Sequence, residues 1–556
     1  MGRLTPLEIL GLSEPIEQVY SNTVDALLIK IAEHFNGGHK LSTSAWELQK
    51  LSELGQLNKE CLEIIATLTG QVPEMIYIAL ESAAIKATKD VEPELKKAVE
   101  KGAIKPAATD NVIASKRIQQ ALTAYNLQAK DKLNLVNTTM LESTQALFRK
   151  IVTNTVAIER QMQAAQQTLN VAAGKVIVGT ESRTQALRQA ITDIHKEGIT
   201  GFYDKAGRKW SPEAYVNMDI RTTVHNTAIQ AVKIRQEDYG VDIFRVSRHS
   251  GARPLCFPYQ GKYYSWNNES GTFTDGEGKQ HRYYPISSTS YGKPAGLFGI
   301  NCGHHPITII PGVSIPRDRS TQTKEENDRV YQESQEQRRL ERDVRYTKQK
   351  AAMLEAAGDK EGFEKEALKI KEKQAKYNAF CKKTGRTKRL DRTQVFEYNK
   401  SVSSKAVVAA TRLEKAKAEQ EENKRLQELE QEKQKQQKIT EIRELIKSDS
   451  TPKKLNVGNQ NKHILKSKGY EKGRSYIYGD LNTAQEIVNT YHGTGEIRLS
   501  KKSGEWEWNS KEFITLPDNV GVYINKHTGE RFPTNTVSIH YGKKGTHIVP
   551  ARRKDK

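Results

Sequence analysis

Residues 537–550 read VSIHYGKKGTHIVP, two runs of alternating apolar and polar residues around a turn that contains two glycines. This pattern predicts a β-hairpin. Whether the loop is counted as two residues or four, the register pairs His540 with His547 and Ile539 with Ile548. Directly opposed residues have Cβ atoms ~4.5–5.5 Å apart. We therefore expect the two histidines to lie side by side on one face of a sheet and the isoleucines to face the core.

Two neighbouring imidazoles suit acid–base chemistry. Because their unperturbed pKa is near ~6.5, one can act as general base and the other as general acid, and transesterification by the 2′-hydroxyl of RNA needs both. The side chains that could support charge on the phosphate are Arg498, Lys543 and Lys544, with a hydrogen bond from Ser538 or Thr546. Such a reaction requires no metal or other cofactor. The competing interpretation is that the histidines are solvated polar residues on an exposed sheet face.

The hairpin closes a basic segment that begins after Pro452. Residues 453–556 contain 19 Lys and Arg against 10 Asp and Glu, and five of the thirteen histidines. A capping box that starts at Thr483 predicts a helix ending at Gly493. Alternating runs predict further strands at residues 497–499, 505–508 and 520–524. Residues 451–556 are therefore expected to form a separate small α+β domain with an antiparallel sheet.

Polar motifs in this segment resemble the bacterial polymorphic toxin type 50 domain, from about Leu455 to Pro550. They are residues 459–463 (NQNKH), 473–476 (GRSY), 491–495 (YHGTG), 521–523 (GVY) and 539–550 (IHYGKKGTHIVP). The resemblance implies the fold of barnase and the colicin ribonucleases, and a metal-independent ribonuclease in which His463 joins His540 and His547. It makes RNA the substrate and an immunity protein a candidate partner. We expect His492 to cap the helix and His527 to lie exposed in a turn.

The rest of the chain predicts further units, because 556 residues exceed what one hydrophobic core supports. Helical periodicity runs through residues 1–170, which predicts a mainly α region. Residues 171–315 have short β-prone runs around one helix, which indicates an α/β domain, and residues 316–450 predict long charged helices and a spacer. Capping motifs predict helix starts at Thr5, Ser44 and Ser211. The fold class is therefore multidomain.

Composition limits the partners and the location of the protein. The net charge of +21 favours polyanions, packaged DNA among them. The four cysteines lie far apart, so reduced thiols are expected. No apolar run approaches the ~18–20 residues that span a bilayer. We therefore expect no membrane partner and synthesis in the cytoplasm of a bacterial host.

Motifs in the middle of the chain resemble the phage minor capsid protein 2 family, which belongs with head-morphogenesis proteins similar to the Mu F protein. They are residues 248–254 (RHSGARP), 259–262 (YQGK), 296–305 (GLFGINCGHH) and 337–342 (QRRLER). The likeness covers most of residues 1 to about 400. It implies a structural protein that associates with portal and capsid proteins inside the phage head, and so a place in the virion. It implies no catalysis in this part.

Nitrogen and sulfur donors of the kind that bind zinc occur in two segments of the middle region. They are His249, Cys256, Cys302, His304 and His305. The two segments could converge, but the spacing is irregular and contains no CxxC. Packed loops with hydrogen-bonded histidines and a buried thiol are the common alternative, so we expect no metal and keep zinc as the competing hypothesis. A nucleophilic Cys302 is disfavoured because no orienting acid stands at a recognisable spacing.

Two interpretations of the whole chain remain open. We predict that a phage head protein carries a ribonuclease toxin at its C-terminus, which makes the last domain an endoribonuclease. In the alternative, the protein is purely structural and its last domain is a non-catalytic module that binds RNA or a capsid partner. Trp506, Trp508 and Tyr523 would suit stacking on single strands. A DNA-processing enzyme is disfavoured, because the sequence contains no P-loop and no paired-carboxylate metal motif.

Overall fold

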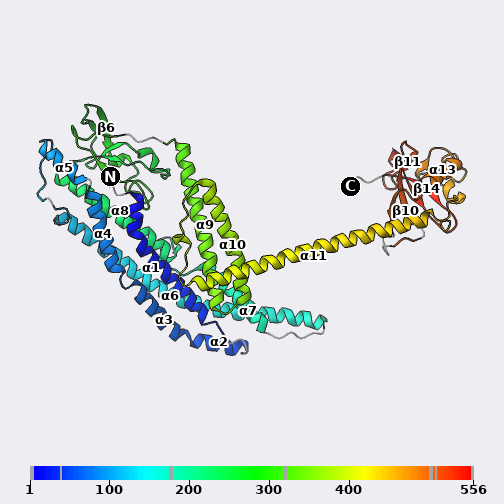
Figure 1. Cartoon of the computed structure of the whole chain (residues 1–556), viewed down its shortest axis with the longest axis horizontal. Coiled ribbons are helices and arrows are strands. Elements are labelled where there is room, and N and C mark those ends of the chain that lie inside the picture. Colours follow the sequence, from blue (N-terminus) through cyan, green and yellow to red (C-terminus); the bar gives the residue numbers. More distant parts are fainter. Residues whose placement is uncertain are drawn as a thin grey trace. The chain divides into compact units, whose positions relative to one another are not determined.

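The computed structural model describes residues 5–37, 41–89, 91–109, 111–173, 180–317, 322–499, 505–507 and 510–552. The chain forms two compact units, Met1–Lys415 and Ala416–Lys556. The boundary between them falls within helix α11 (Lys400–Lys447) (Figure 1). The second unit therefore begins in the charged helix, ahead of the compositional break at Pro452.

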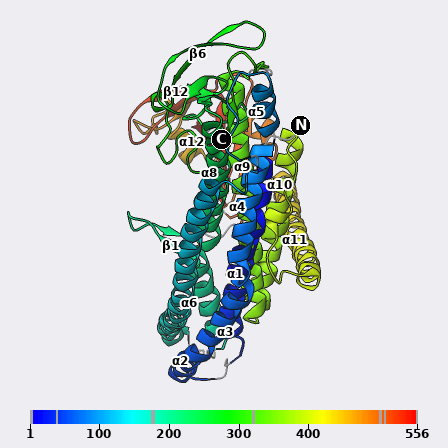
Figure 2. The same cartoon turned by 90° about the vertical axis from the view of Figure 1, so that its left-hand side faces the viewer.

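The first unit opens with a bundle in which longer helices run alongside one another and shorter ones lie at the ends (Figure 2). They are α1 (Pro6–Glu33), α2 (Thr43–Ser52), α3 (Leu54–Thr69), α4 (Val72–Lys89), α5 (Val91–Glu100), α6 (Lys116–Ala173), α7 (Thr180–Glu197) and α8 (Pro212–Asp238). Helix α8 contacts α1, α4 and α6. The core between them is mostly aliphatic, with Phe35 stacked on Phe148 at 4.9 Å between ring centroids. Burial of these apolar faces is what stabilises the bundle.

The predicted helix starts agree with the structure at two of three positions. Thr5 caps α1 in a reciprocal capping box, and Ser211 caps α8. The prediction for Ser44 is wrong, because Ser42 accepts the hydrogen bond from the Ala45 amide and α2 begins at Thr43. Both serines are good N-caps, so the local sequence does not distinguish them.

The middle of the first unit is a five-stranded sheet in the order β5-β6-β4-β3-β7. Its strands are β3 (Ile243–Val246), β4 (Tyr263–Ser265), β5 (Gly271–Thr274), β6 (Gln280–Pro285) and β7 (Pro306–Thr308), with the 3-10 turns η1 (Phe257–Tyr259) and η2 (Ile286–Ser288) between them. Only β4 and β6 pair in parallel. A short ribbon of β1 (Phe202–Tyr203) and β2 (Lys209–Trp210) precedes α8. The expected α/β middle is confirmed.

Charged helices follow the sheet. Helix α9 (Lys324–Ala356) packs against α10 (Lys360–Thr384), and η3 (Asp391–Thr393) precedes α11. Arg345 of α9 pairs with the buried Asp25 of α1 at 2.8 Å, which ties this hairpin to the first bundle. Along α11, Leu426 and Leu429 are exposed, as expected of a solvated helix. None of the helices that the structure describes is both long enough and apolar enough to cross a bilayer.

The second unit is a small α+β fold, as predicted. Its helices and strands are α12 (Val457–Asn461), β8 (Tyr476–Ile477), α13 (Leu481–Tyr491), β9 (Glu496–Arg498), β10 (Lys511–Thr515), β11 (Gly521–Ile524), β12 (Arg531–Thr534), β13 (Thr536–His540) and β14 (His547–Ala551). Two antiparallel sheets have the orders β14-β13-β10-β9 and β12-β11-β8. Ile487 and Val488 of α13 share one core with Ile514 and Ile539, so the helix covers the apolar face of the four-stranded sheet.

Two local predictions for this unit need correction. The strand expected at residues 505–508 is absent from its described part, residues 505–507, and Trp508 lies outside the described residues; the strand instead occupies Lys511–Thr515. Helix α13 begins before Thr483, because Asp480 is the N-cap and Thr483 is the third helical residue of its capping box. Asp is as good a cap as Thr, which explains the shift.

Candidate functional site

A row of basic side chains crosses the four-stranded sheet of the second unit. In the antiparallel register Arg498 is opposite Lys511, Lys511 is opposite His540, and His540 is opposite His547. Directly paired residues point to the same face of a sheet, so the row lies on the face away from α13.

The predicted hairpin register is confirmed. Ile539 and Ile548 are paired and fully buried, and the ring centroids of His540 and His547 are 4.7 Å apart. His540 Nε2 lies 2.9 Å from the hydroxyl of Ser538, which is also 3.3 Å from the Val549 carbonyl oxygen. A hydroxyl can donate one hydrogen bond and accept others. Ser538 can therefore bond His540 whether or not Nε2 carries a proton.

A third imidazole reaches this pair from the segment after α12. His463 is 5% exposed, and its ring centroid lies 6.1 Å from that of His547. Its Nδ1–H donates to the Ser475 carbonyl oxygen at 2.6 Å. Because a carbonyl oxygen only accepts, the proton of the neutral ring is on Nδ1 and the lone pair is on Nε2. His463 thus has the tautomer that a general base at Nε2 requires.

The three imidazoles are held in the neutral form. Burial lowers the pKa of His540 to about 3 and that of His547 to about 4, and it also lowers the pKa of His463. These values include smaller contributions from neighbouring imidazoles and from the charge of Lys511, which act in the same direction as burial. An anion within ~4–6 Å acts in the other direction, because it favours the protonated ring. A bound phosphate would therefore raise these pKa values.

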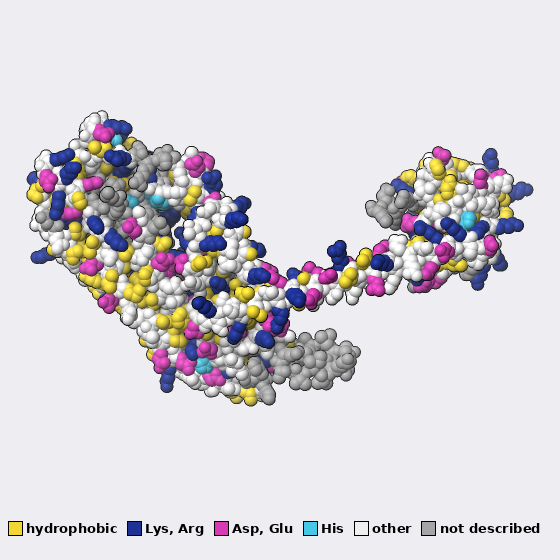
Figure 3. Space-filling model, in the orientation of Figure 1, with side chains coloured by type: hydrophobic (Ala, Val, Ile, Leu, Met, Phe, Trp, Pro, Cys, Tyr) yellow, Lys and Arg dark blue, Asp and Glu magenta, His cyan; other side chains and the backbone are white. Residues whose placement is uncertain are grey.

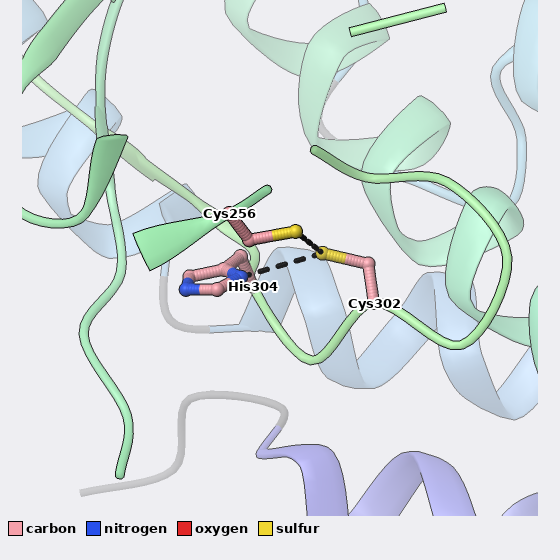
Figure 4. Close-up of side chains that lie close together, drawn as sticks. All are labelled: Cys256, Cys302 and His304. Carbon is pink, nitrogen blue, oxygen red and sulfur yellow. Dashed lines mark hydrogen bonds between the residues drawn. The ribbon is translucent and has the colours of Figure 1, made fainter. Parts of the chain in front are cut away.

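In the first unit, two loops bring sulfur and nitrogen atoms together (Figure 4). The Sγ atoms of Cys256 and Cys302 are 3.9 Å apart, and Cys302 Sγ is 3.3 Å from His304 Nδ1. All three residues are buried. The His249 ring lies beside them, 4.3 Å from the His304 ring. Among the described residues His305 is not part of this cluster, and its backbone N–H donates to the Ser247 hydroxyl at 2.9 Å.

Residues 4–169 and 154–382 match the family model of phage minor capsid protein 2. The chain belongs to this family. Residues 455–550 match the model of bacterial toxin 50, so both resemblances noted in the sequence are confirmed. A protein of Lactococcus phage LL-H described as "Structural protein" is 27% identical over 319 residues, which cover 56% of this chain and 78% of that protein.

The toxin domain of this minor capsid protein brings only some of its predicted site residues together. His463, His540, His547 and Ser538 converge as described above. Arg498 lies in the same row, two strands away from His540, with its guanidinium 4.1 Å from the centre of the Phe513 ring. Lys543 and Lys544 are exposed at the tip of the hairpin. Lys511 thus stands between Arg498 and His540 in the row, and the other two lysines lie in the turn between β13 and β14.

Thr546 faces away from the histidines. It is fully buried, and its hydroxyl donates to the Pro452 carbonyl oxygen at 2.5 Å. Neighbouring residues on a strand point to opposite faces, so Thr546 and His547 could not both serve the same site. Its role is to anchor the hairpin to the segment that follows α11.

Lys511 is a candidate site residue that the sequence analysis missed. Residues 511–515 read KEFIT, which does not alternate because the charged Glu512 faces the core together with Ile514, and the strand had been assigned to residues 505–508. Lys511 is exposed and lies directly opposite His540. Among the cations of the row, Lys511 is therefore the one paired directly with a histidine.

The motif YHGTG has a structural explanation. The buried Glu512 accepts hydrogen bonds from the Tyr541 hydroxyl at 2.6 Å and from the amides of Gly493 and Gly495 at 2.9 and 2.6 Å. His492 donates from Nδ1 to the Val488 carbonyl oxygen at 2.8 Å, which confirms it as the cap of α13. The motif thus fixes the end of the helix against the sheet. His527 is exposed in its turn, as predicted.

Proposed function

We propose that residues 455–550 are a metal-independent endoribonuclease toxin, carried by a minor protein of the phage head. The convergence of His463, His540 and His547 carries the proposal. One of these rings has its lone pair fixed at Nε2. General acid–base cleavage of a phosphodiester needs a base and an acid within reach of one phosphate, and three adjacent imidazoles can supply both.

In the proposed reaction, His463 Nε2 takes the proton of an RNA 2′-hydroxyl, and the 2′-oxygen forms a bond to the adjacent phosphorus. The P–O5′ bond breaks, and protonated His540 or His547 gives its proton to the leaving 5′-oxygen. The products are a 2′,3′-cyclic phosphate and a 5′-hydroxyl, so the atoms balance without water. Lys511 stabilises the charge on the non-bridging oxygens.

The charges around the histidines support an RNA substrate. The cations that act on the pKa of the three rings are Lys462, Arg474, Lys511 and Lys526. They repel a proton, and a phosphate that neutralises them removes this part of the pKa lowering, while its own charge favours the protonated ring. Substrate binding therefore favours the acid, whereas the base is neutral beforehand.

The test is cleavage of RNA by residues 416–556, which form a compact unit. We expect cleavage in the presence of a chelator, products with 2′,3′-cyclic phosphate ends, and no cleavage at a nucleotide that lacks its 2′-hydroxyl. A folded fragment that binds RNA without cutting it would refute the enzyme and support a non-catalytic RNA-binding module. A folded fragment that does neither would point to a capsid-binding module.

The first unit is proposed to assemble with portal and capsid proteins in the interior of the phage head. Its family membership supports this role, and so do apolar side chains that remain exposed on its helices. Leu62 of α3 and Ile78 and Ile85 of α4 are among them. Hydrophobic side chains gather along this side of the unit (Figure 3). Apolar surface of this kind marks contacts with other proteins.

A further inference from the structure

We propose that Cys256, Cys302, His304 and His249 bind one Zn²⁺ ion in the capsid part of the chain, with both cysteines as thiolates. Two sulfurs and two imidazole nitrogens are a donor set that zinc takes in closed, structural sites. Magnesium and calcium prefer oxygen ligands, so the donor chemistry selects the metal. This site is independent of the proposed ribonuclease, since it lies in the other unit.

Three of the four donor residues, Cys256, Cys302 and His304, already have ligand atoms within 4.8 Å of one another, and His249 lies beside them. With Zn–S bonds of about 2.3 Å and Zn–N bonds of about 2.0–2.1 Å, tetrahedral angles place two sulfurs about 3.8 Å apart and a sulfur and a nitrogen about 3.5 Å apart. The corresponding separations are 3.9 Å for Cys256 and Cys302 and 3.3 Å for Cys302 and His304. These two separations therefore need to change by only a few tenths of an ångström to accept the ion.

The fold brings the two ligand-bearing loops together at one end of β3. Strand β3 pairs with both β4 and β7, and Val246 at its end is opposite Pro306 at the start of β7. Cys256 lies in the loop that leaves β3, while Cys302 and His304 lie in the loop that enters β7 (Figure 4). The loops are thus neighbours because of the sheet, and not because of their spacing in the sequence.

Other contacts hold these loops in place. Arg253 donates to the carbonyl oxygens of Ile300 and Gly296 at 2.7 and 3.2 Å, which joins one loop to the other. His225 of α8 donates from Nε2 to the His304 carbonyl oxygen at 2.7 Å. Contacts of this kind orient metal ligands before the ion arrives. The motifs at residues 248–254 and 296–305 therefore have a structural role, which is to position the two ligand-bearing loops.

His249 is the fourth ligand. Its Nδ1–H donates to the Ser250 carbonyl oxygen at 3.1 Å, so the lone pair of the neutral ring is on Nε2. That Nε2 atom is buried and has no hydrogen-bond partner within the described parts of the chain. Buried polar atoms are rarely left in this state. An ion beside the neighbouring His304 would supply the partner, and a metal-binding histidine commonly donates its other N–H to a carbonyl.

The experiment measures metal in the full-length chain, purified under reducing conditions without chelator. We expect one zinc per chain, and replacement by Co²⁺ should give the visible spectrum of a tetrahedral cobalt thiolate. Cys302→Ser and His304→Ala should lose the metal. Cys381→Ser, which changes a buried cysteine elsewhere in the same unit, should keep it. His249→Ala should weaken zinc binding at least about tenfold, because even residues that only hydrogen-bond to a metal ligand contribute that much to metal affinity.

A second measurement covers the case in which Cys302→Ser fails to fold. Removal of zinc from the unchanged chain by a chelator should increase hydrogen exchange at residues 247–262 and 296–305, and added zinc should reverse the increase. A folded, reduced chain that binds no zinc would overturn the proposal. So would a disulfide between Cys256 and Cys302 in the freshly purified protein, or zinc that stays bound in folded Cys302→Ser.

Discussion

Gln460 makes two hydrogen bonds to the backbone of Ile548: its Nε2 donates to the carbonyl oxygen at 3.3 Å, and its Oε1 accepts from the amide at 2.7 Å. Gln460 is fully buried, so its amide group replaces the neighbouring strand that β14 lacks on this side. Ile548 follows His547, and Gln460 precedes His463 by one turn. The distance between the two histidines therefore depends on this pair of bonds.

Gln460→Ala is expected to slow RNA cleavage more than the loss of stability explains. It leaves two buried backbone groups of Ile548 without partners, which costs about 1–3 kcal/mol each, and it frees His463 to move relative to His547. Gln485→Ala is the matched control, because Gln485 makes the same kind of paired bonds, to the backbone of Lys453 and Leu455. Urea unfolding and single-turnover cleavage of residues 416–556 would be measured for both. Equal loss of cleavage in the two variants would contradict the assigned role.

Alanine at His463, His540 or His547 is expected to lower the cleavage rate about 10²–10⁴-fold, the usual contribution of a general acid or base. His527→Ala is the control, since that histidine is exposed in a turn of the same domain. The rates would be followed with a labelled oligoribonucleotide at substrate concentrations that saturate the fragment. If His527→Ala is as damaging as the other three, the site lies elsewhere.

The sequence was informative wherever side-chain alternation coincided with a single possible turn. The hairpin at residues 537–550 follows from period-two alternation and an even loop, and both His540 opposite His547 and buried Ile539 resulted from it. The same logic failed at Lys511, because the run EWEW at residues 505–508 alternates strictly, whereas the true strand KEFIT does not: its charged Glu512 is buried beside Ile514. Local sequence patterns do not show which of two adjacent segments forms a strand when tertiary packing decides the outcome.

Contacts between distant segments could not be predicted in this way. The approach of His463 to His547 depends on hydrogen bonds from Gln460 and to the Ser475 carbonyl oxygen; the motifs at residues 459–463 and 473–476 contain these residues, but only the resemblance, and no local pattern, implied that His463 joins the pair. The convergence of Cys256, Cys302 and His304 was only a competing hypothesis, because their spacing is irregular. Its geometry comes from the pairing of β3 with β7, and strand order in a sheet is a property of the whole fold.

The stability of the toxin domain should fall as the pH falls below neutrality. The unfolded histidines titrate near ~6.5, whereas the pKa is about 3 for folded His540 and about 4 for His547. Between these values the unfolded chain binds more protons, so the stability present above pH ~6.5 is lost as pH decreases toward the folded values, by at most ~1.4 kcal/mol per pH unit for each histidine.

Unfolding of residues 416–556 at several pH values would check this dependence. The double variant His540→Gln, His547→Gln should show a flatter profile, and His527→Gln should follow the unchanged domain. A DNA strand that cannot be cleaved should protect the unchanged domain from acid, because phosphate raises the pKa of the rings. A double variant with the slope of the unchanged domain would show that other groups titrate.

Ile78 and Ile85 provide a test of the head-assembly surface. They lie two turns apart on α4, so they share one face, and both are exposed. Ile78→Ser with Ile85→Ser should leave thermal unfolding nearly unchanged, since exposed substitutions usually alter stability by less than about 0.5 kcal/mol. Incorporation into phage heads should decrease. The control is Ala79→Ser, which changes a buried neighbour on the same helix and should lower stability. Phage heads that contain normal amounts of the double variant would exclude this surface.

The end of α11 should behave as part of the toxin domain. Ile442 and Ile446 are buried in the same core as Ile539 and Val488, so Ile446→Ala should cost about 2–5 kcal/mol of unfolding free energy in residues 416–556. Leu429→Ala, on an exposed stretch of the same helix, should cost less than about 0.5 kcal/mol. A fragment that starts at residue 453 lacks both isoleucines and should be less stable and less toxic for that reason alone. If it matches residues 416–556 in urea unfolding, α11 is only a connector.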